Sequence, residues 1–234
     1  MISGKTKIIA CPVVIEELKS KLPPGIECET LDFGLHRTPE DLKVKLQEAV
    51  DNSTGYDTIV LAYGLCGQAV IGLRSETATI VVPRADDCIA IFLGSRDAYL
   101  KEQRNNPGSL FLSKGWIEGR IDDSTPPPVM KDYPIMVKRY GEERAKRMQA
   151  VYQEKFRLRN YQRMAFINTT AESNLDEYKD RARQRAAKLN LRYEEIPGSV
   201  AFMEKIAGGD WDGEFMIAPP GRAITFEDFF IPDK

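Results

Sequence analysis

Three of the four cysteines lie directly after segments that are predicted to form β-strands. Cys11 ends the first of these segments, Cys66 follows residues 58–63, and Cys88 follows residues 79–83. In an open α/β sheet the carboxyl ends of parallel strands share one edge, and ligands bind there. We therefore expect three thiols that are distant along the chain to meet in space. Such an arrangement suits a metal ion, an iron–sulfur cluster or a reactive thiol.

Three thiolates can hold zinc with an open fourth position, or a [4Fe–4S] cluster with one iron free for substrate. Zinc bound in this way acts as a Lewis acid or holds a thiolate substrate. His36, the single histidine, follows the second predicted strand and is a candidate fourth ligand or proton donor. The fourth cysteine, Cys28, lies within a predicted strand and is expected to pack in the core.

The chain around two of the cysteines favours a ligand site. Gly64 and Gly67 flank Cys66, and glycines let backbone N–H groups approach a cofactor closely. Cys88 lies in the first turn of a predicted helix, where the helix dipole favours a thiolate. Asp86 and Asp87 oppose that effect electrostatically.

Other side chains are predicted at the same edge of the sheet. Arg84 and Arg222 could hold a carboxylate or a phosphate. We assign His36 and Arg84 as candidate catalytic residues, and Arg222, with the two glycines, as a candidate cofactor-binding residue. Trp116 could close over a pocket, but its large apolar ring predicts a place in the core.

Composition narrows the class of protein. The 234 residues are 42% hydrophobic and 29% charged, with a net charge of −2, as in a soluble globular protein. Without a basic face or a long apolar segment, we expect neither nucleic acid nor a membrane as a partner. No signal peptide is evident at the N-terminus, so we expect a cytoplasmic protein with reduced thiols. This composition and net charge are also compatible with a homo-oligomer.

The order of predicted elements indicates an α/β fold with parallel, Rossmann-like sheets in two similar lobes, joined by a helical and loop insertion. The first lobe covers residues 1–116, the insertion 117–162 and the second lobe 163–234. One continuous doubly wound sheet with an insertion explains the pattern equally well.

Hydrophobic periodicity and turn residues give the expected bounds of each element. Strands are expected at 8–14, 26–33, 58–63, 79–82, 163–168, 191–196 and 214–218, with a strand and turn at 109–116. Helices are expected at 15–22, 38–50, 68–73, 86–104, 135–159, 173–189 and 200–207.

Several short motifs around the candidate residues resemble a known family, the domain-of-unknown-function 1638 family. They are Ala10-Cys11, Asp32-Phe-Gly-Leu-His36, Tyr63-Gly-Leu-Cys66-Gly67, Pro83-Arg84 to Asp87-Cys88, Leu93-Gly-Ser-Arg96 and Gly115-Trp116. The resemblance covers roughly the whole chain. It implies no established activity. Where the family pattern leads us to expect a second histidine, this chain has Ala85 or Asp86.

The resemblance also implies a type of organism and a metabolic context. Members of the family occur mainly in anaerobes such as methanogens and acetogens, often among genes of corrinoid-dependent methyl transfer. This implies a role in one-carbon metabolism, with a small molecule or a corrinoid protein as the substrate. A contact with the corrinoid itself is part of that expectation.

Three hypotheses follow for the function. The first is a metal or iron–sulfur enzyme that transfers a methyl or thiol group, with Cys11, Cys66 and Cys88 as ligands. The second is a non-catalytic partner or chaperone of a corrinoid methyltransferase, which uses the charged segment 138–159 and the Pro-rich loop before it as its contact surface. The third is an enzyme with a nucleophilic cysteine at Cys66 or Cys88, for which His36 is the one imidazole available as a base.

Overall fold

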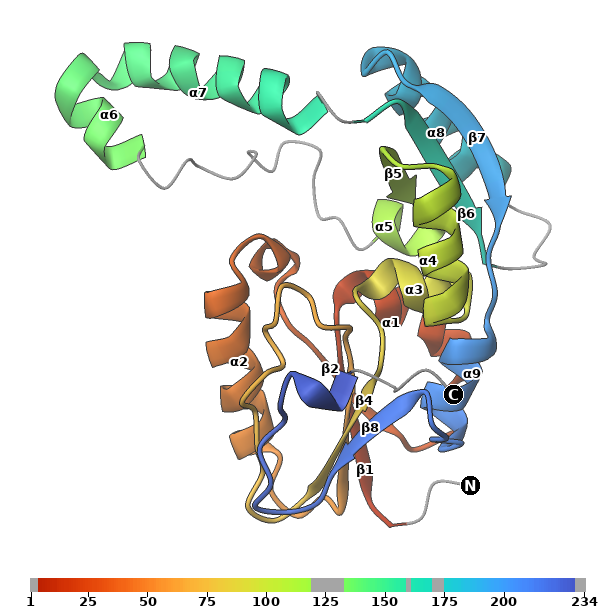
Figure 1. Cartoon of the computed structure of the whole chain (residues 1–234). Helices are drawn as coiled ribbons and strands as arrows, with labels where there is room; N and C mark the ends of the chain where they lie inside the picture. Colours follow the sequence, from red (N-terminus) through yellow and green to blue (C-terminus); the bar gives the residue numbers. More distant parts are fainter. Residues whose placement is uncertain (1–3, 119–132, 159–160, 170–174, 230–234) are drawn as a thin grey trace.

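The computed structural model describes residues 4–118, 133–158, 161–169 and 175–229 (Figure 1). The Pro-rich loop expected to contact a partner lies largely outside these residues. The chain is mixed α/β, as predicted, and its described strands form two sheets. No helix in the described ranges is both long enough and apolar enough to cross a membrane.

The larger sheet has five strands in the order β2-β1-β3-β4-β8. Its first four strands are parallel, and β8 pairs antiparallel with β4. The strands are β1 (Thr6–Ala10), β2 (Glu27–Thr30), β3 (Thr58–Ala62), β4 (Thr79–Pro83) and β8 (Phe215–Ala218). The smaller sheet is parallel, in the order β5-β6-β7, with strands β5 (Ser109–Leu112), β6 (Arg163–Asn168) and β7 (Arg192–Pro197).

Helices cover both faces of each sheet, and the described helices complete a layered arrangement. The helix α2 (Pro39–Asn52) packs on the outer face of the larger sheet, and α8 (Asp176–Lys188) packs on the outer face of the smaller one. Between the sheets lie α1 (Pro12–Leu18), α3 (Cys88–Leu93) and α9 (Ala201–Gly208). The remaining elements are α4 (Arg96–Asn105), α5 (Lys114–Glu118), α6 (Tyr133–Tyr140), α7 (Glu142–Leu158), η1 (Lys19–Lys21), η2 (Phe33–Arg37) and η3 (Glu227–Phe229).

Alternation along the strands explains the layers. In β1, Ile8 faces the core between the two sheets, and Ile9 faces α2. In β6, Ala165 contributes to that same central core, and Phe166 packs under α8. Successive side chains point to opposite faces of a strand, so the central residues of strands covered on both sides are apolar on both faces. One continuous hydrophobic core therefore joins the two sheets.

Two strands lie in a different sheet from the one that the expected lobes would give. The strand β5 comes from the range expected for the first lobe but lies in the smaller sheet. The strand β8 comes from the range expected for the second lobe but forms the edge of the larger sheet. The boundaries after residues 116 and 162 stay predictions.

Local sequence explains where the elements differ from expectation. The first strand ends at Ala10 instead of continuing to residue 14, because Pro12 occupies the first turn of α1. The helix expected over 86–104 is two helices, because Gly94 adopts a φ of 87° and Ser95 caps α4. A helix was expected over residues 68–73, but residues 68–72 form turns and Leu73 lies in no regular element. Gln68 begins this segment with a φ of 72°, which no α-helix contains.

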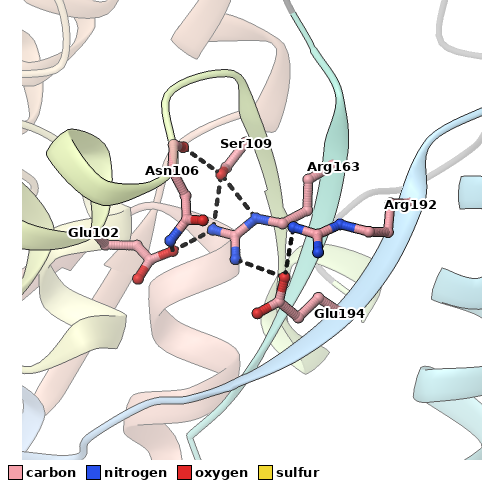
Figure 2. Close-up of polar contacts among 6 residues, drawn as sticks. All are labelled: Glu102, Asn106, Ser109, Arg163, Arg192 and Glu194. Carbon is pink, nitrogen blue, oxygen red and sulfur yellow. Dashed lines mark hydrogen bonds and ion pairs between the residues drawn. The ribbon is translucent and has the colours of Figure 1, made fainter.

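A buried charge cluster holds the smaller sheet together (Figure 2). Arg163 is 3% exposed, and its Nε and Nη2 donate to the Ser109 Oγ at 3.0 and 2.8 Å. It forms ion pairs with Glu102 and, at 3.0 Å, with Glu194. A buried guanidinium requires such partners, because an unpaired charge in the core is strongly destabilising. The cluster joins α4 to all three strands, and Arg192 extends it by pairing with Glu194 at 3.1 Å.

A second buried contact joins α1 to the smaller sheet. The Glu17 carboxylate is 6% exposed and accepts hydrogen bonds from the Gly115 backbone N–H, at 2.9 Å, and from the Thr169 hydroxyl. A Cβ at position 115 would lie 2.1 Å from the carbonyl oxygen of Val13. Only glycine therefore allows α5 to approach α1 this closely.

This close approach gives a test of the packing between the sheets. Gly115→Ala should lower the free energy of unfolding by about 1–3 kcal/mol, because the added methyl group overpacks the contact. The control is Gly208→Ala, where a Cβ meets nothing within 4 Å, and it should not destabilise the protein. Urea unfolding of both variants measures the difference. Equal stabilities would contradict the tight contact between α1 and α5.

Candidate functional site

The three cysteines that follow strands lie in the wall of one pocket. Cys11 separates β1 from α1, Cys66 follows β3, and Cys88 begins α3 just after β4. The pocket therefore lies at the carboxyl edge of the parallel strands, where the sequence placed it. Its volume is about 40 Å³. The other lining residues are Asp32, Phe33, His36, Leu42, Ala62, Tyr63 and Trp116.

The loop that carries Cys66 is held against the loop before Cys88. Leu65 N–H donates to the Ala85 carbonyl at 2.8 Å, and Cys66 N–H donates to the Asp86 carbonyl at 3.2 Å. At Gly64 a Cβ would lie 2.7 Å from the Asp87 Cα, so this contact requires glycine.

The backbone of Cys66 itself adopts an uncommon conformation. Its φ is 45°, in the left-handed region, and the next two residues also have positive φ. A residue other than glycine in this region costs on the order of 1–3 kcal/mol and persists where its surroundings hold it. Gly67, with a φ of 70°, takes the same conformation without that cost, and a Cβ there would lie 2.7 Å from the Pro39 Cγ. The strain is therefore located at a thiol of the pocket.

Burial raises the pKa of the pocket thiols. It raises the pKa of Cys11 to about 11, although the backbone N–H groups of Val13 and Val14 offset part of the effect. The pKa of Cys66 is raised to about 12, mainly by burial, and the nearby Cys11 and Asp87 contribute to this increase. The thiols are therefore protonated at neutral pH in the metal-free protein.

Cys88 does not gain the lowered pKa that its place at a helix start would favour. Burial raises the pKa of this thiol well above its usual value, and Asp87 and the two other pocket thiols add to the effect. The Asp87 carboxylate accepts a hydrogen bond from Ile89 N–H at 2.8 Å, so it caps α3 and brings a negative charge close to Cys88. The Trp116 N–H offsets only part of these effects.

An aromatic group forms one side of the pocket. The His36 ring lies 4.4 Å from the Phe33 ring and 5.7 Å from the Trp116 ring, measured between centroids. Its Nδ1 is 2.5 Å from the Phe33 carbonyl oxygen. A carbonyl only accepts hydrogen bonds, so Nδ1 carries the proton, and in the neutral ring Nε2 holds the lone pair. His36 is exposed and lies at the mouth of the pocket.

Trp116 is the lining residue whose role the sequence left open, because a tryptophan is most often a core residue. It is partly buried and also packs edge-on against Phe33, at 5.5 Å between centroids. Its Nε1 is buried, and no hydrogen bond with good geometry forms there among the described residues. The Nε1–H nevertheless lies close enough to the Cys88 thiol to lower its pKa. The Gly115-Trp116 motif was the sequence signal for this position.

The two arginines predicted at the site do not line the pocket. The Arg84 Nε donates to the Phe215 carbonyl at 3.1 Å, and its guanidinium also contacts the Asp228 carbonyl. Arg222 pairs with the Asp228 carboxylate. Because β8 is antiparallel, its end lies beside the start of β4, which places Arg222 toward the opposite edge of the sheet. Neither arginine is positioned to hold a ligand in the pocket.

The donor set suits a metal, but the side chains do not converge on one. Within the ranges that the structure describes, no three His, Cys, Asp or Glu side chains are arranged to hold a metal ion. Three thiols and an imidazole with a lone pair on Nε2 nevertheless match the ligands that zinc prefers. A cysteine side chain turns about a single torsion, so its sulfur can move without the backbone. The candidate residues share a pocket wall and would have to turn inward to bind an ion.

Comparisons with known proteins identify one family. No curated protein and no solved structure matches the chain. The family described as "Protein of unknown function (DUF1638)" matches residues 30–207. That range includes His36, Cys66, Cys88 and Trp116, whereas Cys11 precedes it. Because the match covers well over half of the 234 residues, the chain belongs to the DUF1638 family.

Proposed function

We propose that the pocket binds a thiophilic metal centre through Cys11, Cys66 and Cys88. The observation that carries the proposal is that three cysteines from three separate strand ends line one small pocket. His36 stands at its mouth with Nδ1 held by a carbonyl, the arrangement that orients a histidine toward a metal. His36 is thus a fourth ligand or a proton donor to a bound group.

The electrostatics of the pocket support a metal over a free nucleophile. A reactive cysteine needs a lowered pKa, usually from a nearby Lys, Arg or protonated His. None of the lining residues is Lys or Arg, and burial raises the pKa of all three thiols. A bound cation supplies the missing positive charge and converts thiols to thiolates.

The ligand set favours zinc. Zinc accepts one imidazole beside three thiolates, and His36 lines the pocket together with the three cysteines. We therefore favour zinc and keep the cluster as the alternative.

We extend the proposal to a transferase of methyl or thiol groups in one-carbon metabolism. A metal with three thiolate ligands and an open position would act there as a Lewis acid or hold a thiolate. The extension rests on the family resemblance. A corrinoid is far larger than the pocket, so any corrinoid contact would occur at its mouth, where His36 is exposed.

One observation favours the second candidate function, a non-catalytic partner protein. The helices α6 and α7 pack on each other and extend away from the two sheets as an arm (Figure 1). Residues 133–158 contain seven Lys and Arg against three Glu, although the whole chain has a net charge of −2. Such an arm would suit an acidic protein surface. Copurification of a metal-free protein with a corrinoid-system partner would favour this role.

Two further expectations belong to the proposal. Alternation of parallel strands and helices in both sheets supports a Rossmann-like description with two lobes. Four free cysteines support a reducing, cytoplasmic environment.

Metal content tests the proposal directly. Protein purified without oxygen should contain about one equivalent of zinc, and Cys→Ser replacement at position 11, 66 or 88 should remove most of it. Cys28→Ser is the matched control, because Cys28 lies within β2 and outside the pocket, and it should keep the metal. Elemental analysis of the four variants gives the result. Iron with acid-labile sulfide would favour the cluster, and full metal content in all the variants would reject the site.

Thiol reactivity separates a metal site from a nucleophilic cysteine. In metal-free protein with Cys28→Ser, alkylation by iodoacetamide should be slow at pH 7 and should still be accelerating at pH 11. The raised pKa values keep the thiols protonated below that range, and only the thiolate reacts. Mass spectrometry of each labelled peptide between pH 7 and 11 measures the rates. One thiol labelled rapidly at neutral pH would instead support a nucleophilic enzyme.

A further inference from the structure

Aromatic rings form a continuous surface on one side of the pocket. Phe33, His36 and Trp116 all belong to the lining. Phe33 and His36 lie three positions apart in the 3₁₀ helix η2, where side chains at that spacing are eclipsed, and their ring centroids are 4.4 Å apart. Trp116 reaches the same surface from α5. Two segments that are distant along the chain therefore build one aromatic wall.

The indole of this wall meets the other two rings almost at right angles. Its plane is inclined by 89° to the Phe33 ring and by 81° to the His36 ring, at centroid distances of 5.5 and 5.7 Å. In an edge-to-face pair, the corner between the two planes is bounded by one face of each ring. Ring faces carry partial negative charge and attract cations, and the indole face attracts them most strongly. A cation in such a corner contacts two faces together.

A carboxylate lies in the same pocket as these rings. Asp32 is a lining residue and is exposed, so it lies at the mouth, as His36 does. Its Oδ1 accepts a hydrogen bond from Gly34 N–H at 2.7 Å, which fixes the side chain at the start of η2. Among the residues that the structure describes, no Lys or Arg pairs with Asp32 or lines the pocket. The mouth therefore offers negative charge and ring faces without a positive charge of its own.

The remaining wall decides which kind of cation is favoured. A primary ammonium carries three N–H donors, and losing their water is costly unless acceptors replace it. Leu42 and Ala62 offer no side-chain acceptor, and the thiols are only weak ones. A quaternary ammonium has no N–H to satisfy, and its methyl groups suit apolar and aromatic surfaces. The lining therefore favours a cation whose charge is covered by methyl groups.

We propose that the mouth of the pocket binds a quaternary ammonium compound, whose methylated head group lies against the aromatic wall beside the Asp32 carboxylate. Trp116 supplies the principal ring face, and Asp32 supplies the opposite charge. Neither residue is a ligand of the proposed metal site. The inference therefore goes beyond that site and does not rest on it.

A matched pair of ligands tests the role of the charge. Choline and 3,3-dimethylbutan-1-ol have nearly the same shape, but the alcohol has a neutral carbon in place of the quaternary nitrogen. In calorimetric titrations of the full chain after treatment with a chelator, choline should bind about tenfold more tightly or better. Equal affinities, or no binding of choline at millimolar concentrations, would overturn the inference. The metal content of the untreated protein tests the metal site separately.

Two substitutions test the location. Asp32→Asn keeps an oxygen for the Gly34 N–H but removes the charge, and it should weaken choline binding about fivefold while the affinity for the neutral alcohol stays the same. Trp116→Leu should weaken choline binding about tenfold, and Trp116→Phe, which keeps a ring, should weaken it less. Asp97→Asn is the matched control, because Asp97 is an exposed carboxylate outside the pocket, and it should bind choline as the parent chain does.

Circular dichroism shows which variants are folded, and Trp116→Phe replaces Trp116→Leu in the comparison if the leucine variant unfolds. Unchanged choline affinity in a folded Asp32→Asn protein, or in the folded Trp116 variant, would place the ligand elsewhere and overturn the inference.

Discussion

The desolvation of three neighbouring thiols is the constraint on which the site depends. Cys11, Cys66 and Cys88 are partly removed from bulk water at the end of a parallel sheet, and each is close enough to the others to oppose their ionisation. A thiolate in such a place needs a positive charge beside it, and the lining residues supply no Lys or Arg. The thiols can therefore stay neutral, as ordinary core residues do, or ionise together around a cation. Because three cysteines share one wall of the pocket, we favour the second outcome, ionisation around a cation, as the hypothesis to test.

The backbone around the site supports this interpretation. The chain accepts a left-handed conformation at Cys66, where a glycine would be less costly, and it places Gly64 against the backbone of Asp87. Both features fix the loop after β3 relative to the loop after β4. A site that holds a small ligand needs such fixed walls, because a shift of the thiol-bearing loops changes the distance between potential ligands.

Sequence patterns predicted the fold class and the place of three cysteines at one edge of the sheet, because both depend on local regularities. Apolar runs such as 58–63 mark buried parallel strands, and a cysteine just after such a strand must lie at the shared edge. The pattern could not show that β8 would return antiparallel to β4, since strand direction is set by tertiary pairing. For the same reason Arg222 was expected at the wrong edge of the sheet. Arg84 was expected at the correct edge, but its guanidinium turns to the backbone of β8 and η3, which no local signal reveals.

The role of Trp116 could not be predicted locally either, because it depends on contact between the two sheets. The side chain follows β5, a strand of the smaller sheet, yet it lines a pocket formed by the larger one. What brings it there is the buried carboxylate of Glu17, which binds α5 through Gly115 N–H and binds the end of β6 through the Thr169 hydroxyl. Because Glu17 lies on α1, the helix that begins just after Cys11, a shift of the smaller sheet would move both a wall and a thiol of the pocket. The smaller sheet is therefore part of the site's construction, and the shape of the pocket depends on how tightly α1 and α5 pack.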